Sequence, residues 1–281
     1  METLLTVIKT PGEAKGFIGY VARLANDLQF NVHLVYIQEP QEYTMVQPPS
    51  AGIASSAQIL EKNADNAKKV LAGLIEEIKD ESTKGISISY SAEIARTITV
   101  INDYISNNKA GMVILEEDEK SSFWSQSSST SDIVNQAGCP VWVIPFNHPY
   151  KPFKNIVYAT DYKEEDIKTL KNLIGLTYRF SPAVTALHIT DTSDFEEKIK
   201  ETGFSEIVHS KTGYQNISVI SLNEKGHNSA AGMINDYALE IGADLIVILK
   251  ENKSFLNRII SPGETGKIIK EAGLPVLVYS Y

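Results

Sequence analysis

The sequence has little cysteine, little positive charge and no long hydrophobic run. Its 281 residues include a single cysteine, Cys139, which excludes an intrachain disulfide and a zinc site of several cysteines. No apolar stretch approaches the roughly 20 residues of a membrane-spanning helix, and no signal peptide is recognisable at the start. With 26 Lys and Arg against 35 Asp and Glu, the formal net charge is -9. We therefore expect a cytoplasmic protein that binds neither nucleic acid nor membranes.

The chain is long enough for two domains of about 150 residues. Three prolines in Pro145–Pro152 are typical of a short, stiff connection, which predicts domains at residues 1–146 and 147–281. The two halves end alike, in Ala137-Gly-Cys-Pro-Val-Trp-Val-Ile144 and Ala272-Gly-Leu-Pro-Val-Leu-Val-Tyr279. Matching segments in the same order indicate a tandem duplication.

Each half alternates short apolar runs with longer stretches whose apolar residues have helical spacing. This alternation predicts parallel β-sheets flanked by helices, with five strands in each domain. The expected strands are Leu4–Ile8, Val32–Ile37, Ile86–Tyr90, Met112–Leu115, Val141–Ile144, Ile156–Ala159, Val184–Ile189, Ile217–Leu222, Leu245–Leu249 and Val276–Tyr279. The expected helices are Phe17–Leu28, Ile59–Ile78, Thr97–Ile105, Ile167–Tyr178 and Met233–Ile241. Two glycines in Ser193–Gln215 predict only a short helix and a loop there.

Several of these segments resemble the universal stress protein family. The cues are Asn155-Ile-Val-Tyr-Ala-Thr-Asp161, Ala186-Leu-His-Ile189, Ala243-Asp-Leu-Ile-Val-Ile248 and the two domain endings. The resemblance covers nearly the whole chain and implies two flavodoxin-like, adenine-nucleotide-hydrolase-like domains. In members that bind ATP, an Asp after the first strand contacts the adenine. These members also have a loop that reads Gly-x-x-Gly, then nine residues, then Gly-Ser/Thr. The backbone N–H groups of this loop bind the phosphates.

The second half keeps part of this pattern. Asp161 stands at the adenine position, but Leu249, Asn252 and Pro262 replace the three loop glycines, and proline has no N–H to donate. Lys250, Lys253 and Arg258 supply positive charge nearby. The resemblance therefore implies these candidate nucleotide-binding residues: Ala159, Thr160, Asp161, His188, Asn252, Gly263, Glu264 and Thr265.

The first half departs further from the pattern. Thr10 replaces the adenine-contacting Asp, and Glu116 and Glu119 replace loop glycines within a run of four acidic residues. Only Ser129 and Thr130 keep a phosphate-facing element. Each carboxylate placed about 4 Å from a phosphate costs about 4 kcal/mol at an effective dielectric near 20, so we expect no ATP in this half. The acidic run reads as a solvated loop or, alternatively, as a Mg²⁺ or Ca²⁺ site.

No other motif points to catalysis. Gly263-Glu-Thr-Gly-Lys267 lacks the residues that a P-loop needs and reads as a helix start with Pro262 in its first turn. His188 and Cys139 read as structural residues, and we assign no catalytic or metal-binding residue. The segment Ser121–Ser131 contains Phe123 and Trp124 and reads as a flexible loop or as a docking site for a protein partner.

These observations predict a universal stress protein that acts as a non-catalytic stress-response or regulatory module with degenerate ATP-binding loops. The alternative is an adenine-nucleotide-binding protein, or slow ATPase, that uses the second domain only. A metal-dependent enzyme on the acidic loop is a third reading, which lacks a supporting pair of histidines. Because an unpaired apolar edge strand favours aggregation, we also expect the two fifth strands to pair in an intramolecular pseudo-dimer.

Overall fold

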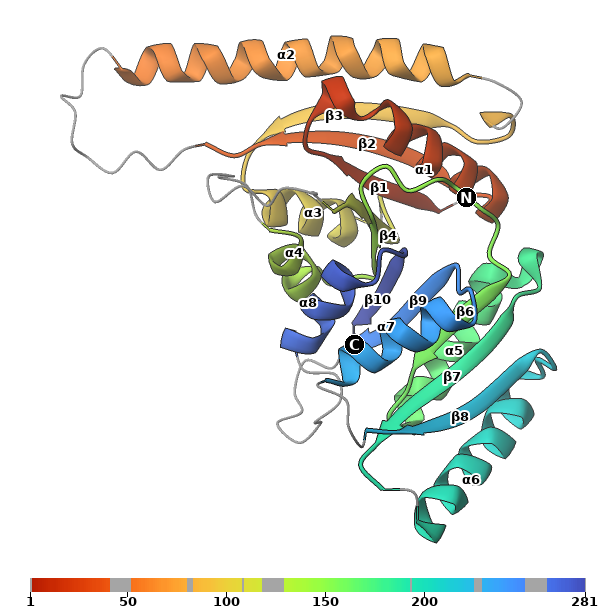
Figure 1. Cartoon of the computed structure of the whole chain (residues 1–281). Coiled ribbons are helices and arrows are strands. Elements are labelled where there is room, and N and C mark those ends of the chain that lie inside the picture. The colour runs from red at the N-terminus through yellow and green to blue at the C-terminus, as the bar shows by residue number, and fades with distance from the viewer. Residues whose placement is uncertain are drawn as a thin grey trace. The chain divides into compact units, whose positions relative to one another are not determined.

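The chain divides into two compact units, each an α/β structure (Figure 1). The computed structural model describes residues 2–40, 52–79, 83–107, 109–117, 129–192, 194–224, 229–250 and 262–280. The first unit contains residues 1–141 and 146–150, and the second contains residues 142–145 and 151–281. None of the described helices combines the length and apolarity needed to cross a membrane.

The first unit contains four parallel strands in the order β3-β2-β1-β4. Leu4 of β1 lies between Val32 of β2 and Met112 of β4, which fixes the register. Helices α1 and α2 contact each other and β2, and α3 contacts β2 and α4. The elements are β1 (Thr3–Ile8), the short 3-10 turn η1 (Pro11–Glu13), α1 (Lys15–Leu28), β2 (Asn31–Gln38), α2 (Gly52–Ile78), β3 (Ile88–Ile94), α3 (Thr97–Ser106), β4 (Met112–Glu116) and α4 (Thr130–Gln136).

The second unit contains parallel strands in the order β10-β9-β6-β7-β8. Helix α6 contacts α5 and β8, while α7 contacts α8, β6 and β7. The elements are β6 (Asn155–Ala159), α5 (Glu164–Thr177), the 3-10 turn η3 (Tyr178–Phe180), β7 (Ala183–Thr190), α6 (Phe195–Thr212), β8 (Ile217–Asn223), α7 (Ala230–Glu240), β9 (Leu245–Lys250), α8 (Pro262–Glu271) and β10 (Val276–Ser280).

Strand β5 (Val141–Ile144) falls at the division between the units. Its first residue groups with the first unit, and Trp142–Ile144 group with the second. There the Trp142 ring lies 5.4 Å from the ring of Phe153, which contacts Phe180 at 5.2 Å. All four residues of β5 are buried, as the apolar sequence predicts.

The proline-containing segment after β5 packs against α1 of its own unit. The Tyr150 hydroxyl donates a hydrogen bond to Asp27, and its ring meets Tyr20 edge-on at 5.2 Å. Burial and the hydrogen bond to Asp27 raise the pKa of Tyr150 far above its usual value. Residues 146–150 are therefore fastened to the first unit rather than crossing freely between the two.

The parallel α/β architecture is confirmed, but the expectation of a short helix and a loop at Ser193–Gln215 is wrong. Helix α6 runs unbroken from Phe195 to Thr212. Asp194 caps its start, and Gly213 ends it with a left-handed φ of 66°. Gly203 costs about 1 kcal/mol inside a helix, and burial of Phe204 and Val208 outweighs that cost.

Candidate functional site

Both units have a point where the strand order reverses, and ligands of open parallel sheets bind outside the carboxyl ends of the strands at such a point. In the first unit it lies between β1 and β4, and in the second between β6 and β9. Most of the residues predicted for a nucleotide fall beside the second of these points. The loop that follows β6 leads to this point and carries Asp161.

A buried carboxylate organises this loop. Asp166, in the first turn of α5, is 3% exposed. It accepts hydrogen bonds from the hydroxyls of Tyr158 at 2.7 Å and Thr160 at 2.8 Å. It also accepts from the backbone N–H groups of Asp161 at 3.1 Å and Lys163 at 3.0 Å. Four donors on one carboxylate fix the backbone that carries Asp161, so this loop is preorganised.

The predicted adenine contact, Asp161, is partly accessible. Its side chain is 17% exposed, and its Oδ2 lies 3.9 Å from Nζ of Lys163. Ala159 and Thr160 just before it are buried, and the Thr160 hydroxyl is engaged by Asp166 and by the N–H of Tyr162. Of these residues only Asp161 offers a partly exposed side chain for a ligand.

An aromatic side chain covers the neighbouring strand ends. Tyr162 has a left-handed φ of 59°, which turns its ring onto His188 at 4.3 Å and Phe204 at 5.0 Å. Its hydroxyl hydrogen-bonds to Ser221 Oγ at 2.7 Å. Burial raises the pKa of Tyr162 to about 12. His188 is buried, and its Nδ1 donates to the Thr160 carbonyl at 2.7 Å. The Tyr162 ring thus covers one face of His188, which the sequence predicts as a nucleotide-binding residue.

The phosphate side of the predicted site is only partly described. Lys250, at the carboxyl end of β9, is buried, and burial lowers the pKa of its ammonium group. Helix α8 begins at Pro262, as expected, and includes Gly263 and Glu264. Thr265 in its first turn is buried, while Asn252 lies outside the described residues. The structure therefore groups Thr160, Asp161 and His188 closely and leaves the phosphate contacts a prediction.

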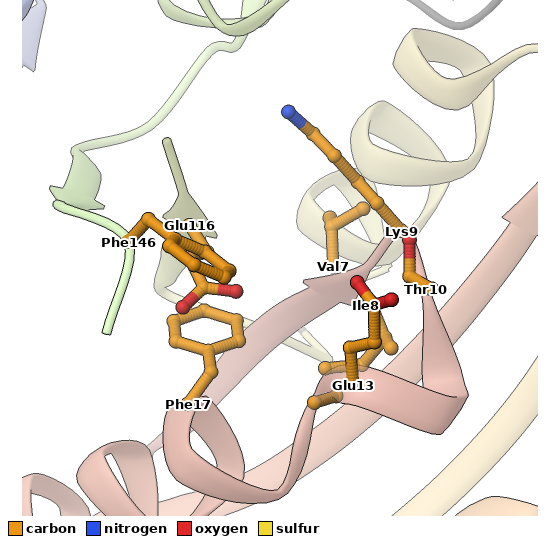
Figure 2. A pocket seen from close by; sticks show the side chains of 9 residues that line it. Val7, Ile8, Lys9, Thr10, Glu13, Phe17, Glu116 and Phe146 are labelled. Atoms are coloured by element: carbon orange, nitrogen blue, oxygen red, sulfur yellow. The ribbon is translucent and has the colours of Figure 1, made fainter. Parts of the chain in front are cut away.

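The corresponding crevice of the first unit is nearly filled (Figure 2). Figure 2 shows the rings of Phe17 and Phe146 beside the carboxylate of Glu116, with Thr10 on the opposite side. The remaining cavity is about 40 Å³. Ligand pockets usually measure roughly 300–1,000 Å³, so this cavity is well below that range.

The other residues singled out in the first unit have structural partners. Ser129 caps α4: its hydroxyl accepts from the N–H of Asp132 at 3.1 Å, and Asp132 accepts from the N–H of Ser129 at 3.1 Å. Cys139 is buried, and burial raises the pKa of its thiol to about 12. Glu119 and Ser121–Ser128 lie outside the described residues. Within the part that the structure describes, no three His, Cys, Asp or Glu side chains are placed to hold a metal ion.

Sequence reasoning missed three residues that shape the second unit. Asp166 had at most a weak signal, because its N-cap residue is Lys163 and not the Ser, Thr, Asp or Asn that marks a capping box. Glu197 had a clearer signal, because it stands three residues after Asp194, which caps α6, but that spacing predicts a helix start and not the ion pair with His188. Tyr162 had none, because its role depends on packing against His188, which lies far from it in the sequence.

The fold defines a protein of tandem parallel α/β units. The sequence profile of the Universal stress protein family matches residues 1–145 and again residues 152–280. The chain therefore belongs to the universal stress protein family and contains two of its domains.

The chain is similar to several individual proteins over part or all of its length. Universal stress protein MJ0531 of Methanocaldococcus jannaschii is 28% identical over 138 residues, 45% of this chain and 81% of that protein. A universal stress protein structure from Archaeoglobus fulgidus DSM 4304 matches 99% of this chain and 98% of its own, with a TM-score of 0.70 and 12% identity. Another from Archaeoglobus fulgidus, in complex with dAMP, covers 46% of this chain and 99% of its own at 17% identity and a TM-score of 0.35. The dAMP is a finding about that protein alone.

Proposed function

We propose that the protein is a non-catalytic stress-response or regulatory module, acting in the cytoplasm, with degenerate ATP-binding loops in both units. The observation that carries this proposal is the crevice between β1 and β4. There Phe17, Phe146 and Glu116 leave about 40 Å³, too little for an adenine base. Glu116 would also repel phosphates at a cost of about 4 kcal/mol per close pair. We infer that such a module acts by binding a protein partner.

The alternative is adenine-nucleotide binding, with slow ATP hydrolysis as its strongest form, by the second unit alone. Asp161 at the adenine position and the cationic Lys250 at the end of β9 support it. Tyr162 covering His188 counts against it, as does Pro262 in place of a phosphate-binding glycine. We therefore rank nucleotide binding second.

Titration calorimetry of the full chain with Mg-ATP and with AMP, together with native mass spectrometry of the purified protein, tests both. Our proposal expects no retained nucleotide and no saturable heat at millimolar ATP. The variants are Asp161→Asn and, as a matched control with the same charge change, Asp236→Asn on the exposed face of α7. Saturable ATP binding that Asp161→Asn abolishes and Asp236→Asn preserves would replace our proposal by the alternative.

We also infer that the two domains form an internal pseudo-dimer through their fifth strands. Residues 142–145 support it, because they lie inside the first family match and yet group with the second unit. The double variant Val143→Thr/Val278→Thr places hydroxyls at two buried positions and should separate the unfolding of the two halves. The control is Val70→Thr, at a 40% exposed position of α2. A single transition with an unchanged midpoint in the double variant would contradict the inference.

A further inference from the structure

The outer helix of the second unit carries exposed apolar side chains in addition to its buried ones. Figure 1 shows α6 beside β8, the last strand of this unit, and α6 also contacts α5. Phe195, Ile199 and Ile207 of α6 are 77%, 55% and 46% exposed. No other element in the described part of the chain has more than two large apolar side chains as exposed as these. The outer side of α6 is therefore the strongest candidate for a protein-binding surface in this unit.

The exposed apolar residues of α6 are spaced four positions apart. Phe195, Ile199, Gly203 and Ile207 occupy positions i, i+4, i+8 and i+12 of one helix. Side chains at this spacing form a continuous ridge, and such ridges are the rows through which packed helices contact each other. A Cβ at Gly203 would meet no atom within 4 Å, so a second helix can approach the backbone closely at the centre of the ridge. The spacing is that of a helix-packing surface.

Charged residues near the two ends of the ridge favour another copy of α6 as the second helix. Glu196 and Lys211 are exposed and stand seven residues before and eight residues after Gly203. At about 100° per residue, both are displaced to the same side of Gly203, by about 20° and 80°. In an antiparallel pair centred on Gly203, Glu196 of one copy therefore lies on the same side as Lys211 of the other, within one residue of its level. Twofold symmetry forms this pair of opposite charges twice.

The opposite orientation is unfavourable. A parallel pair of α6 helices would place Glu196 beside Glu196 and Lys211 beside Lys211, and like charges across an interface repel. The antiparallel pair also brings Ile199 of one copy level with Ile207 of the other, since each stands four residues from Gly203. Apolar spacing and charge thus favour the same arrangement.

We propose that α6 is a self-association surface through which two copies of the chain form an antiparallel dimer. The pairing buries Phe195, Ile199 and Ile207 of each copy. One helix from each copy gives an interface at or below the roughly 1,200–2,000 Å² of stable complexes, so the dimer is weak and forms at high protein concentration. It differs from the internal pseudo-dimer, which uses the fifth strands within one chain, and it does not depend on nucleotide binding.

Sedimentation velocity of the full chain, from about 1 μM to about 1 mM, tests the proposal by mass action. We expect a reversible shift from monomer to dimer as the concentration rises. Ile199→Glu places two carboxylates at the apolar centre of the dimer and should weaken it at least about tenfold. Ile59→Glu is the matched control, because Ile59 is 59% exposed on α2 of the first unit. It makes the same change outside the ridge and should leave the dimer unchanged, and circular dichroism checks the folding of both variants.

A charge exchange tests the orientation of the helices. Glu196→Lys and Lys211→Glu should each weaken the dimer about threefold, and the double variant should restore it, because the two charges are exchanged across the interface. Weakening that adds up in the double variant would overturn the antiparallel pair.

Three other results would overturn the proposal as a whole. They are a monomer at every concentration, a dimer that Ile199→Glu leaves unchanged, and equal weakening by Ile199→Glu and Ile59→Glu. A monomer throughout would indicate that a different protein or another part of the chain covers the ridge. Equal weakening would indicate a general repulsion between acidic chains. Selective weakening by folded Ile199→Glu would support the proposal.

Discussion

Removal of the Asp166 carboxylate should destabilise the second unit strongly, because this side chain holds the loop between β6 and α5. Asp166→Ala takes an acceptor from the buried hydroxyls of Tyr158 and Thr160 and from two backbone N–H groups. Hydrogen bonds to a charged group contribute about 1.5–3 kcal/mol each, and they are not additive. Partial rehydration of the loop lowers the sum, so we expect a loss of about 3–5 kcal/mol. That is a large part of the roughly 5–15 kcal/mol by which a domain is stable.

The matched control is Asp132→Ala. Asp132 holds the same third position of a helix, in α4 of the first unit, but it is exposed in the capping box with Ser129. Its loss should cost about 1 kcal/mol. A second arm adds Tyr158→Phe to Asp166→Ala. Because this change removes a donor that had lost its acceptor, the double variant should lose less stability than the sum of the single changes.

Unfolding in urea should be followed by hydrogen exchange measured for individual peptides, because the two units can unfold separately. The expected result is loss of protection over β6 and α5, with protection of β1 and α1 unchanged. Equal effects of Asp166→Ala and Asp132→Ala would refute the reasoning. Strict additivity of Tyr158→Phe and Asp166→Ala would show that the hydrogen bond between these two residues contributes no coupling energy.

Three further predictions concern single positions. Cys139 should not react with a thiol reagent at pH 8 in the native protein, because burial raises the pKa of its thiol to about 12. In urea the protein should take up one label. Rapid labelling of the native protein would contradict this prediction. Gly203→Ala should stabilise α6 by about 0.5–1 kcal/mol in urea denaturation, because an added Cβ meets no atom within 4 Å. Gly213→Ala should destabilise the helix, because Gly213 has a φ of +66°. Effects of the same sign would be inconsistent with the helix geometry. Tyr162→Phe should cost about 1 kcal/mol through the lost hydrogen bond to Ser221, and an unchanged urea midpoint would argue against that bond.

Much of the fold follows from sequence patterns. The predicted strand Val141–Ile144 matches β5 at both ends, and the predicted Val184–Ile189 differs from β7 by one residue at each end. Buried parallel strands are continuous apolar runs, which makes them recognisable without other information. Helix α6 was misjudged because two glycines suggested a break, whereas burial of one face against α5 and β8 decides the outcome.

The candidate site was predicted less completely. The resemblance to the family implied Asp161 and His188 as nucleotide-binding candidates, which stays a prediction, and the structure places both beside the Thr160 backbone. Spacing could not show that Tyr162 turns through a left-handed conformation and covers His188. That conformation is rare for residues other than glycine, and it is held here by ring packing and by the bond to Ser221.

The sequence by itself determined the duplication and the parallel α/β class. These properties reside in residue type and order, so they can be read from the chain. Tertiary structure alone decided which groups lie next to each carboxylate. It buried Asp166 under four donors and placed Glu197 against His188. Residues distant in sequence become neighbours only when the strands pair, and the energy of a charge depends on those neighbours.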